Sequence, residues 1–153
     1  MDKFFETGTS WSATVARIFL GAVMLPHGLQ KTVGLFGGHG FSGTLEFFTG
    51  GGMPWIVAFL VIVGESLGAL GLIFGFLTRL SAFGVAAIML GAIGMIHGEH
   101  GFFMNWIGQQ AGEGFEYHLL ALGLALSVMV SGAGRLSIDA LISDRLFNSE
   151  KGN

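Results

Sequence analysis

Four long apolar stretches occupy most of this 153-residue chain and limit the folds open to it more than any other feature. They cover residues 13–36, 54–77, 80–97 and 117–135, and the last has its most apolar part at 117–130. A helix needs about 20 apolar residues to cross a bilayer core of about 30 Å. We therefore expect an all-α integral membrane protein, a bundle of four transmembrane helices that forms one domain over residues 1–153.

The scarcity of charge agrees with a membrane location. Only 11% of the residues are charged, against about 25% in soluble domains, which use charge to keep their surface in water. The net charge is −3 and no basic cluster is present, so a nucleic-acid partner is not expected. The chain has no cysteine, which excludes disulfides, thiolate chemistry and cysteine-held iron–sulfur clusters.

Lysine and arginine are distributed unequally between the two sides of the predicted membrane domain. One side carries Lys3, Arg17, Arg79, Arg135, Arg145 and Lys151. The opposite side carries only Lys31. The positive-inside rule therefore predicts that both termini are cytoplasmic, and we expect a multi-pass protein of the bacterial inner membrane. Because Arg17 lies within the first apolar stretch, we expect its side chain to extend to the cytoplasmic surface.

Glycine is frequent within the predicted spans, where it lets helix backbones approach closely. The pairs Gly64/Gly68 and Gly71/Gly75, together with Gly84, Gly91 and Gly94, are expected to serve packing within the bundle, with a homo-oligomer interface as the alternative. Pro26 is expected to kink the first span. The two long connections, 37–52 and 98–116, are rich in glycine and aromatic residues and are expected to be loops at the membrane interface.

Polar residues of the predicted spans gather in their outer half. His27, Gln30 and Lys31 share one helical face. Glu65 lies at a depth of about 16 Å in the second span, comparable with that of His27, so His27 is its best candidate partner. A carboxylate at this depth is costly unless it is paired or protonated. The cluster is either a functional site for a quinone, a proton or a metal, or a structural hydrogen-bonded centre.

Histidines near the ends of the third and fourth spans are weaker candidates for a metal site. His97, His100 and His118 have side chains that suit iron, copper or zinc. However, no HxxxH or ExxH pair lies within one predicted helix, and nothing fixes two histidines opposite each other as haem ligands. Neither a metal nor a haem is thereby excluded.

Several short motifs resemble those of one known family. Residues 16–21 (ARIFLG) and 27–31 (HGLQK) resemble the first-helix pattern of the DoxX family, and residues 36–44 resemble its glycine-rich first loop. Residues 65–69 (ESLGA) resemble the second-helix ExxGG motif, with Ala69 replacing the final glycine. Later segments that are similar to the family lie at 102–103, 114–117 and 132–139. The resemblance implies a four-helix membrane protein, in a family with relatives similar to subunits of thiosulfate:quinone oxidoreductase.

The leading hypothesis is a membrane subunit of a quinone-linked redox assembly, of a respiratory or oxidative-stress type. His27 and Glu65 would exchange protons with a quinone in an outward-facing pocket that Gln30, Lys31 and Glu116 also line. Other membrane or peripheral redox proteins would supply the electrons, so the chain is not expected to be catalytic alone. The alternative is a non-catalytic accessory or assembly subunit of a larger respiratory or photosynthetic complex. Transport of a small solute or metal is a third, weaker hypothesis, because no inverted repeat is evident.

The last part of the chain, residues 140–153, has the pattern of a short amphipathic helix. Its apolar residues are Leu141, Ile142, Leu146 and Phe147. Such a helix is expected to lie on the membrane surface or to contact a partner.

Overall fold

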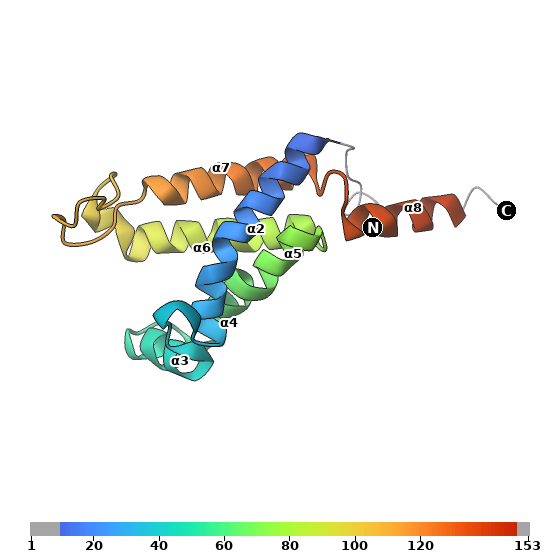
Figure 1. The fold of residues 1–153 in the computed structure, drawn as a ribbon. Coiled ribbons are helices and arrows are strands. Elements are labelled where there is room, and N and C mark those ends of the chain that lie inside the picture. The colour runs from blue at the N-terminus through green and yellow to red at the C-terminus, as the bar shows by residue number, and fades with distance from the viewer. Residues whose placement is uncertain (1–9, 150–153) are drawn as a thin grey trace.

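The computed structural model describes residues 10–149, and side chains as far as Arg145, all of them in helices or connecting loops without a strand. Lys3, Lys151, and the side chains of Leu146 and Phe147 lie outside this range. The helices, in chain order, are α2 (Trp11–Thr32), η1 (Leu35–Gly37), α3 (Gly40–Gly50), α4 (Trp55–Val63), η2 (Gly64–Gly68), α5 (Ala69–Phe74), α6 (Thr78–Met95), η3 (His97–His100), α7 (Glu116–Ser131) and α8 (Ile138–Ser149) (Figure 1).

Three helical segments are long and apolar enough to cross a membrane. They are α2, the continuous run of α4, η2 and α5 over Trp55–Phe74, and α6. The predicted spans 13–36, 54–77 and 80–97 agree with these to within a few residues, so the prediction of an all-helical membrane protein is confirmed. α7 is also apolar but shorter, with 16 residues. α2 continues through Pro26 as one helix.

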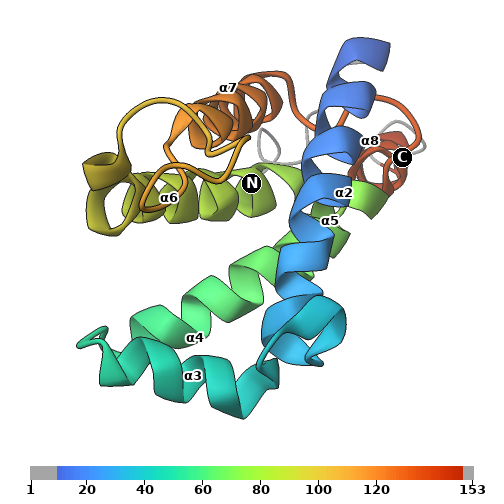
Figure 2. The same cartoon turned by 60° about the vertical axis from the view of Figure 1, so that its left-hand side comes forward.

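The predicted interface loop at 37–52 is wrong in its secondary structure, because most of it forms helix α3. Glycine disfavours a helix when local propensity alone decides. Here aromatic packing stabilises it, since the Phe41 ring meets the Phe59 ring of α4 edge to face at 6.4 Å. The Phe59 ring in turn stacks on Trp55 at 5.5 Å. Figure 2 shows α3 crossing the end of the bundle beside α4.

The core lies where four helical segments meet. α6 and α7 run side by side along most of their length, and α2 crosses them at an angle (Figures 1 and 2). α2, α5, α6 and α7 supply a continuous set of buried apolar side chains: Leu20, Met24, Ala69, Leu72, Ala82, Val85, Ala86, Met89, Ala121, Ala125 and Val128. Many of these are small, which allows the helix backbones to come close.

α2 approaches the second membrane segment through two glycines one heptad apart. A Cβ atom on Gly21 would lie 2.8 Å from the backbone oxygen of Ala69. A Cβ atom on Gly28 would lie 2.4 Å from the backbone oxygen of Glu65. Both distances are shorter than real carbon contacts, so only glycine fits here. The segment that Gly28 touches is η2, a single π-helical turn, and such turns often occur at functional sites.

Five further glycines that were expected to pack inside the bundle differ in their surroundings. Gly64 and Gly71 face α6, where an added Cβ would lie 2.7 Å from the Ile88 side chain and 2.4 Å from the Ser81 hydroxyl respectively. These two serve packing within the chain, as expected. Gly84, Gly91 and Gly94 of α6 have open space at the Cβ position within 4 Å, so the expectation that they also pack inside the bundle is wrong.

Arg17 does not extend to the surface as the sequence analysis expected; it is fully buried, with an exposed fraction of 0%. Its side chain reaches the C-terminal end of α5 and the segment after α7, and each guanidinium hydrogen has a backbone carbonyl to bond. The acceptors, with their distances, are Leu72 at 2.9 Å, Ile73 at 2.6 Å, Ala133 at 2.7 Å, Arg135 at 3.1 Å and Leu136 at 2.7 Å. A desolvated cation is thereby neutralised by the partial charges of carbonyl dipoles.

Asp139 stabilises the same end of the molecule by accepting hydrogen bonds from backbone N–H groups. Its two carboxylate oxygens accept hydrogen bonds from the backbone N–H groups of Leu77 and Thr78, each at 2.9 Å. Thr78 is the first residue of α6, so a side chain at the start of α8 caps a helix about sixty residues earlier in the chain. Asp139 also donates its own N–H to the backbone oxygen of Gly75 at 2.9 Å.

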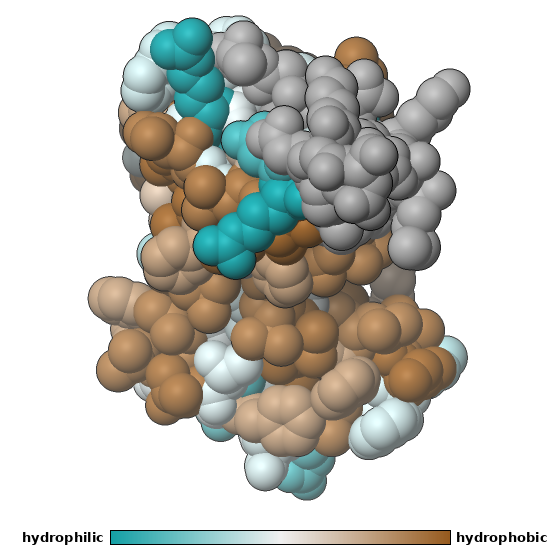
Figure 3. Space-filling model, turned by 90° about the vertical axis from the view of Figure 1, so that its right-hand side faces the viewer, coloured by the Kyte–Doolittle hydropathy of each residue, from teal (hydrophilic) through white to brown (hydrophobic). Residues whose placement is uncertain are grey.

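α8 projects beyond this end of the bundle (Figure 1). Its Leu141 side chain is 64% exposed, and neighbouring Leu136 is 77% exposed. Seen from this side, the surface of the described residues is mostly apolar, with polar side chains in a few places (Figure 3). A helix is present in the segment expected to form one; it begins at Ile138, two residues earlier than expected, and is described as far as Ser149.

The contact between α2 and η2 predicts that Gly28→Ala is destabilising. The added methyl group would overlap the backbone of Glu65 and push the two helices apart, at a cost of about 1–3 kcal/mol, as for overpacking elsewhere. Unfolding of the purified protein in detergent, by heat or denaturant, measures this. Gly84→Ala is the matched control, since its methyl group meets open space. Equal stability of the two variants would contradict the described packing.

The environment of Arg17 predicts that Arg17→Lys is destabilising although it preserves the charge. An ammonium group has three donors and cannot reach all five carbonyls. Losing hydrogen bonds from a buried charged group costs about 1.5–3 kcal/mol for each bond. Arg145→Lys, on an exposed position of α8, should leave the unfolding midpoint unchanged. If the two variants unfold alike, Arg17 does not hold this end of the bundle.

Candidate functional site

The polar residues opposite the Arg17 end centre on an ion pair between α2 and η2. The Lys31 Nζ lies 2.5 Å from Glu65 Oε2, and the two side chains are 20% and 8% exposed respectively. Lys31 therefore takes the place that the sequence analysis gave to His27 as the partner of Glu65. A long flexible amine reaches a buried carboxylate more easily than a short imidazole does, and the pair satisfies the need for a buried charge to be compensated.

The π-helical turn η2 positions Glu65 for this contact. Ser66, the next residue, donates from its hydroxyl to the backbone oxygen of Ile62 at 2.6 Å, and the same hydroxyl lies 3.3 Å from the backbone oxygen of Gly28. The Thr32 hydroxyl also donates to the Gly28 oxygen, at 2.8 Å. The contact between Ser66 and Gly28 joins α2 to η2, whereas the other two bonds lie within their own helical segments. Lys31 and Glu65 therefore meet where the two backbones come close.

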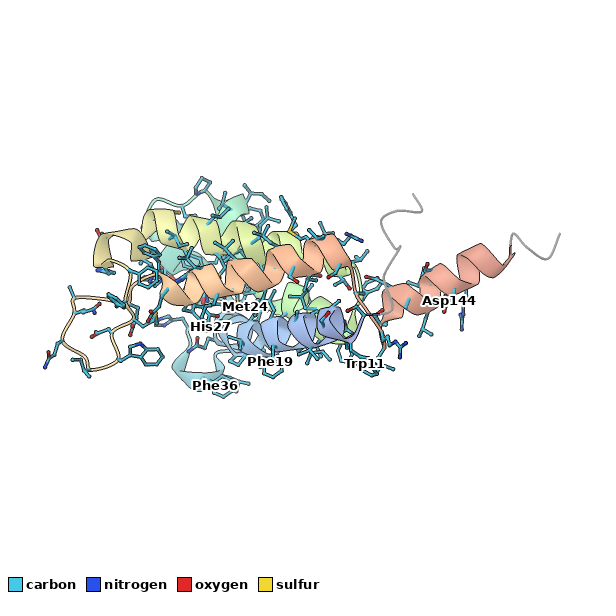
Figure 4. The ribbon with its side chains drawn as sticks, turned by 90° about the horizontal axis from the view of Figure 1, so that it is seen from above. Trp11, Phe19, Met24, His27, Phe36 and Asp144 are labelled. Carbon is cyan, nitrogen blue, oxygen red and sulfur yellow. The ribbon has the colours of Figure 1, made fainter. Side chains whose placement is uncertain are left out.

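His27 lies one helical turn before Lys31 and has an exposed side chain. It is within electrostatic range of both Lys31 and Glu65. Its ring faces Tyr117 of α7, with the centroids 6.3 Å apart. Seen from above, His27 and Met24 lie on α2 toward the end away from Trp11 and from Asp144 of α8 (Figure 4). His27 is thus the accessible member of the group.

Tyr117 was not among the residues singled out from the sequence. Its hydroxyl donates to the Met24 sulfur at 3.6 Å, a weak acceptor for a strong donor. Its ring packs edge to face against His118 at 5.3 Å. A signal was available in the sequence. Tyr117 directly precedes His118 and follows Glu116, at the start of the fourth apolar stretch and in its predicted outer half.

His118 and His97 form a second polar pair at this end. Their ring centroids are 4.1 Å apart with an angle of 40° between the ring planes. His118 is 6% exposed, and its Nδ1 is buried without a hydrogen-bond partner. The Nδ1 of His97 lies 2.8 Å from the backbone oxygen of Glu113, in the loop that precedes α7. The pair therefore connects α7 to that loop.

Gln30 and Glu116, both expected to line a cofactor pocket, make other contacts. Gln30 Nε2 donates to the backbone oxygen of Phe36 at 3.2 Å and so fixes the turn after α2. Glu116 Oε1 accepts hydrogen bonds from the backbone N–H of Met104 at 2.9 Å and from Trp106 Nε1 at 3.1 Å. Both side chains shape the connections around the site.

The weak metal candidates do not converge. His97 and His118 are close, but the His100 side chain instead lies near Glu99, with Nε2 and Oε1 3.7 Å apart. Among residues 10–145, no three His, Cys, Asp or Glu side chains are placed to hold a metal ion. The rings of His97 and His118 are tilted by 40° to each other, and among the described residues no third ligand joins them.

Two surface grooves lie elsewhere on the molecule. One, between α3 and the end of α6, is lined by His39, Gly43, Glu46, Phe47, Phe48, Gly50, Gly51, Met53, Met95 and Ile96. The other lies at the base of α8 and is lined in part by Phe74, Leu136 and Leu141. The outward-opening pocket expected around Glu65 is neither of these.

Comparison with known proteins identifies the chain's relatives. Residues 12–98, more than half of the chain, match the DoxX family. A Bacillus subtilis protein named "Putative oxidoreductase CatD" is 28% identical over 142 residues, which cover 93% of this chain and 92% of that protein. The Escherichia coli inner membrane protein YqjF is 29% identical over 145 residues, 95% of this chain and 99% of that protein. No solved structure matches significantly. The chain belongs to the DoxX family and is a multi-pass protein of the inner membrane.

Proposed function

We propose that this protein is a membrane subunit of a quinone-linked redox assembly, with a quinone site at His27, Lys31 and Glu65. The observation that carries the proposal is the Lys31–Glu65 ion pair, 2.5 Å long and largely buried, beside an accessible histidine. Ionisable groups inside a membrane domain are costly and usually mark a pathway or a binding site. The oxidoreductase name of the Bacillus relative supports redox chemistry.

The chemistry of a quinone fits this set of side chains. Reduction of a quinone to a quinol takes up electrons and an equal number of protons at its two oxygens. His27 and Glu65 would exchange those protons, and Lys31 would donate a hydrogen bond to a quinone oxygen that gains negative charge. Because the chain has no cysteine to hold an iron–sulfur cluster, a partner redox protein of the membrane or its surface would supply or accept the electrons.

The position of His27 suits a ligand that is dissolved in the lipid. It lies five residues before the end of α2, which is about 7.5 Å below that end. At this depth an exposed side chain faces the upper part of the bilayer, where the head of a lipophilic quinone can approach sideways. A water-soluble substrate would instead require an opening through the connecting loops.

The finer membrane arrangement is part of the same proposal. We infer that α7 is a fourth span, because this apolar helix of 16 residues lies beside α6 along most of its length. A shorter helix can span when the bilayer thins locally or flanking residues extend to the interface. Four spans place both termini on one side. The basic residues Arg79, Arg135 and Arg145 make that side cytoplasmic, and the quinone site then faces outward.

A second candidate function is an accessory subunit without chemistry of its own. It is favoured by the loop before α7, where Phe103, Trp106 and Ile107 are 67%, 83% and 78% exposed. Such aromatic and aliphatic side chains could contact another subunit of a larger respiratory or photosynthetic complex. Mild solubilisation would exclude this function if the protein migrated alone and no other chain co-purified with it.

The quinone proposal predicts that Glu65→Gln weakens binding of a short-chain benzoquinone to the purified protein in lipid nanodiscs. Loss of the carboxylate removes both a proton-exchanging group and the partner that positions Lys31. We expect the dissociation constant to rise at least about tenfold, which corresponds to about 1.4 kcal/mol. Isothermal titration calorimetry measures the change.

Glu99→Gln is the matched control, because the Glu99 side chain is 76% exposed and should not affect binding. His27→Phe should also bind more weakly, while retaining the ring that packs near Tyr117. The proposal fails if the wild-type protein does not bind the quinone. It also fails if Glu65→Gln and Glu99→Gln bind it equally well.

The proposed topology can be tested directly because the natural chain has no cysteine. Gln109→Cys places a thiol in the loop before α7, and Asp144→Cys places one on α8. In intact cells, a membrane-impermeant maleimide should label the cysteine at 109 and leave that at 144 unlabelled until the cells are opened. Labelling of both in intact cells would mean that α7 does not span the membrane. The reverse pattern would mean that the orientation is inverted.

A further inference from the structure

We propose that Tyr117, His118 and His97 form a proton relay between the Lys31–Glu65 pair and the loop before α7. This inference deepens the proposed function and rests on it in one respect, since the pair is where the protons would be used. A relay of this kind moves a proton without moving electrons. Each group releases one proton as it receives another, so its charge is restored after every transfer.

The buried Nδ1 of His118 is the first reason for the proposal. A polar atom left without a partner in a buried position costs about 1–3 kcal/mol. An apolar ring at the same place would avoid this cost and would still pack against Tyr117 and His97. An imidazole, in contrast, can accept a proton on one nitrogen and release one from the other. A bound water at Nδ1 would satisfy the atom and extend the path.

The second reason is that His118 joins the two sides of the site. On the loop side, its ring lies 4.1 Å from that of His97, which is partly exposed and bonded to the Glu113 carbonyl. On the inner side, its ring lies 5.3 Å from that of Tyr117. His27 is within electrostatic range of His118, and Glu65 is within range of Tyr117. A series of ring contacts therefore leads from the loop through His118 and Tyr117 to His27, which lies one helical turn before Lys31.

The third reason is the weak fixation of the Tyr117 hydroxyl. Its partner is the sulfur of Met24 at 3.6 Å, and a thioether is a poor acceptor. The hydroxyl can therefore exchange that contact at low cost for a water, through which it would reach the Glu65 carboxylate. A hydroxyl that both donates and accepts can pass a proton between an imidazole and a carboxylate.

The other ionisable groups at this end are engaged or lie at the surface. Lys31 is held by Glu65. The carboxylates of Glu113 and Glu116 accept hydrogen bonds within the loop, from the backbone N–H of Asn105 and from Met104 and Trp106 respectively. Glu99 is exposed and lies near His100. Among the described residues, this leaves His118 as the buried ionisable ring between the pair and the loop.

The test follows the protonation of Glu65 after a rapid drop in pH. The full-length protein is placed in lipid nanodiscs, and time-resolved infrared spectroscopy records the protonated carboxyl band. The band is assigned by its absence in Glu65→Gln. We expect His118→Phe to slow the appearance of the band at least about tenfold without changing its final amplitude. His39→Phe is the matched control, because His39 is exposed on the turn before α3 and should leave the rate unchanged.

A second variant distinguishes proton transfer from packing, and it applies even if His118→Phe does not fold. His97→Ala should also slow the band, and added imidazole should restore the rate, because free imidazole can carry protons at the vacated position. A rate equal to that of the wild type in either variant overturns the relay. So does a slow His97→Ala variant that imidazole does not restore.

This measurement contains no quinone, so its result is independent of quinone binding. A slow variant in a protein that binds no quinone would keep the relay and reject the quinone site. If the wild-type protein binds quinone but His118→Phe or His97→Ala protonates Glu65 at the wild-type rate, the quinone site is kept and the relay is rejected.

Discussion

The burial of Arg17 is the interaction on which the rest of the structure depends. A guanidinium cannot be deprotonated in a protein and supplies five donors, so in an apolar interior it must find five acceptors. Leu72 and Ile73 supply two of them, at the end of α5, where helix carbonyls lack partners of their own. The segment from Ala133 to Leu136 supplies the others. One side chain thus joins the first helix, the C-terminal end of α5 and the chain after α7.

Asp139 completes this arrangement with the opposite charge. It satisfies the N–H groups at the start of α6, while Arg17 satisfies carbonyls at the end of α5. Backbone groups on both sides of the sharp turn between α5 and α6 are therefore bonded by ionised side chains, the carbonyls of Leu72 and Ile73 by Arg17 and the N–H groups of Leu77 and Thr78 by Asp139. At the other end of the molecule, two polar groups of the proposed site lack a strong hydrogen-bond partner. There, the Tyr117 hydroxyl has a sulfur for its acceptor, and one nitrogen of His118 has no partner at all. Incomplete hydrogen bonding beside the proposed site is a local inconsistency of the kind that is typical of functional sites.

The sequence predicted what depends on composition along the chain and missed what depends on three-dimensional contact. Hydropathy located the membrane helices to within a few residues, because burial in lipid acts on each helix independently of its neighbours. It also marked Glu65 and His27 as unusual. It could not assign Lys31 to Glu65, since that pairing depends on the rotation of α2 against the π-helical turn and on the length of the lysine side chain. Arg17 was misjudged for the same reason: a cation near a helix end reaches water unless neighbouring segments offer it enough carbonyls. α3 was missed because aromatic contacts with α4 outweigh the low helix propensity of its glycines.

The π-helical turn links these observations. In a π turn the backbone bonds reach one residue further, so the helix widens and the side chains within it are rotated from their α-helical positions. At η2 this rotation coincides with Gly28, where α2 comes close to the backbone of Glu65. A side chain larger than hydrogen at position 28 would prevent that contact and separate Lys31 from Glu65. The glycine in the HGLQK motif therefore has a definite physical role. It lets α2 come close enough for His27 and Lys31, which stand on either side of it in the motif, to lie near the Glu65 carboxylate. A larger residue at this position would keep the carboxylate out of reach.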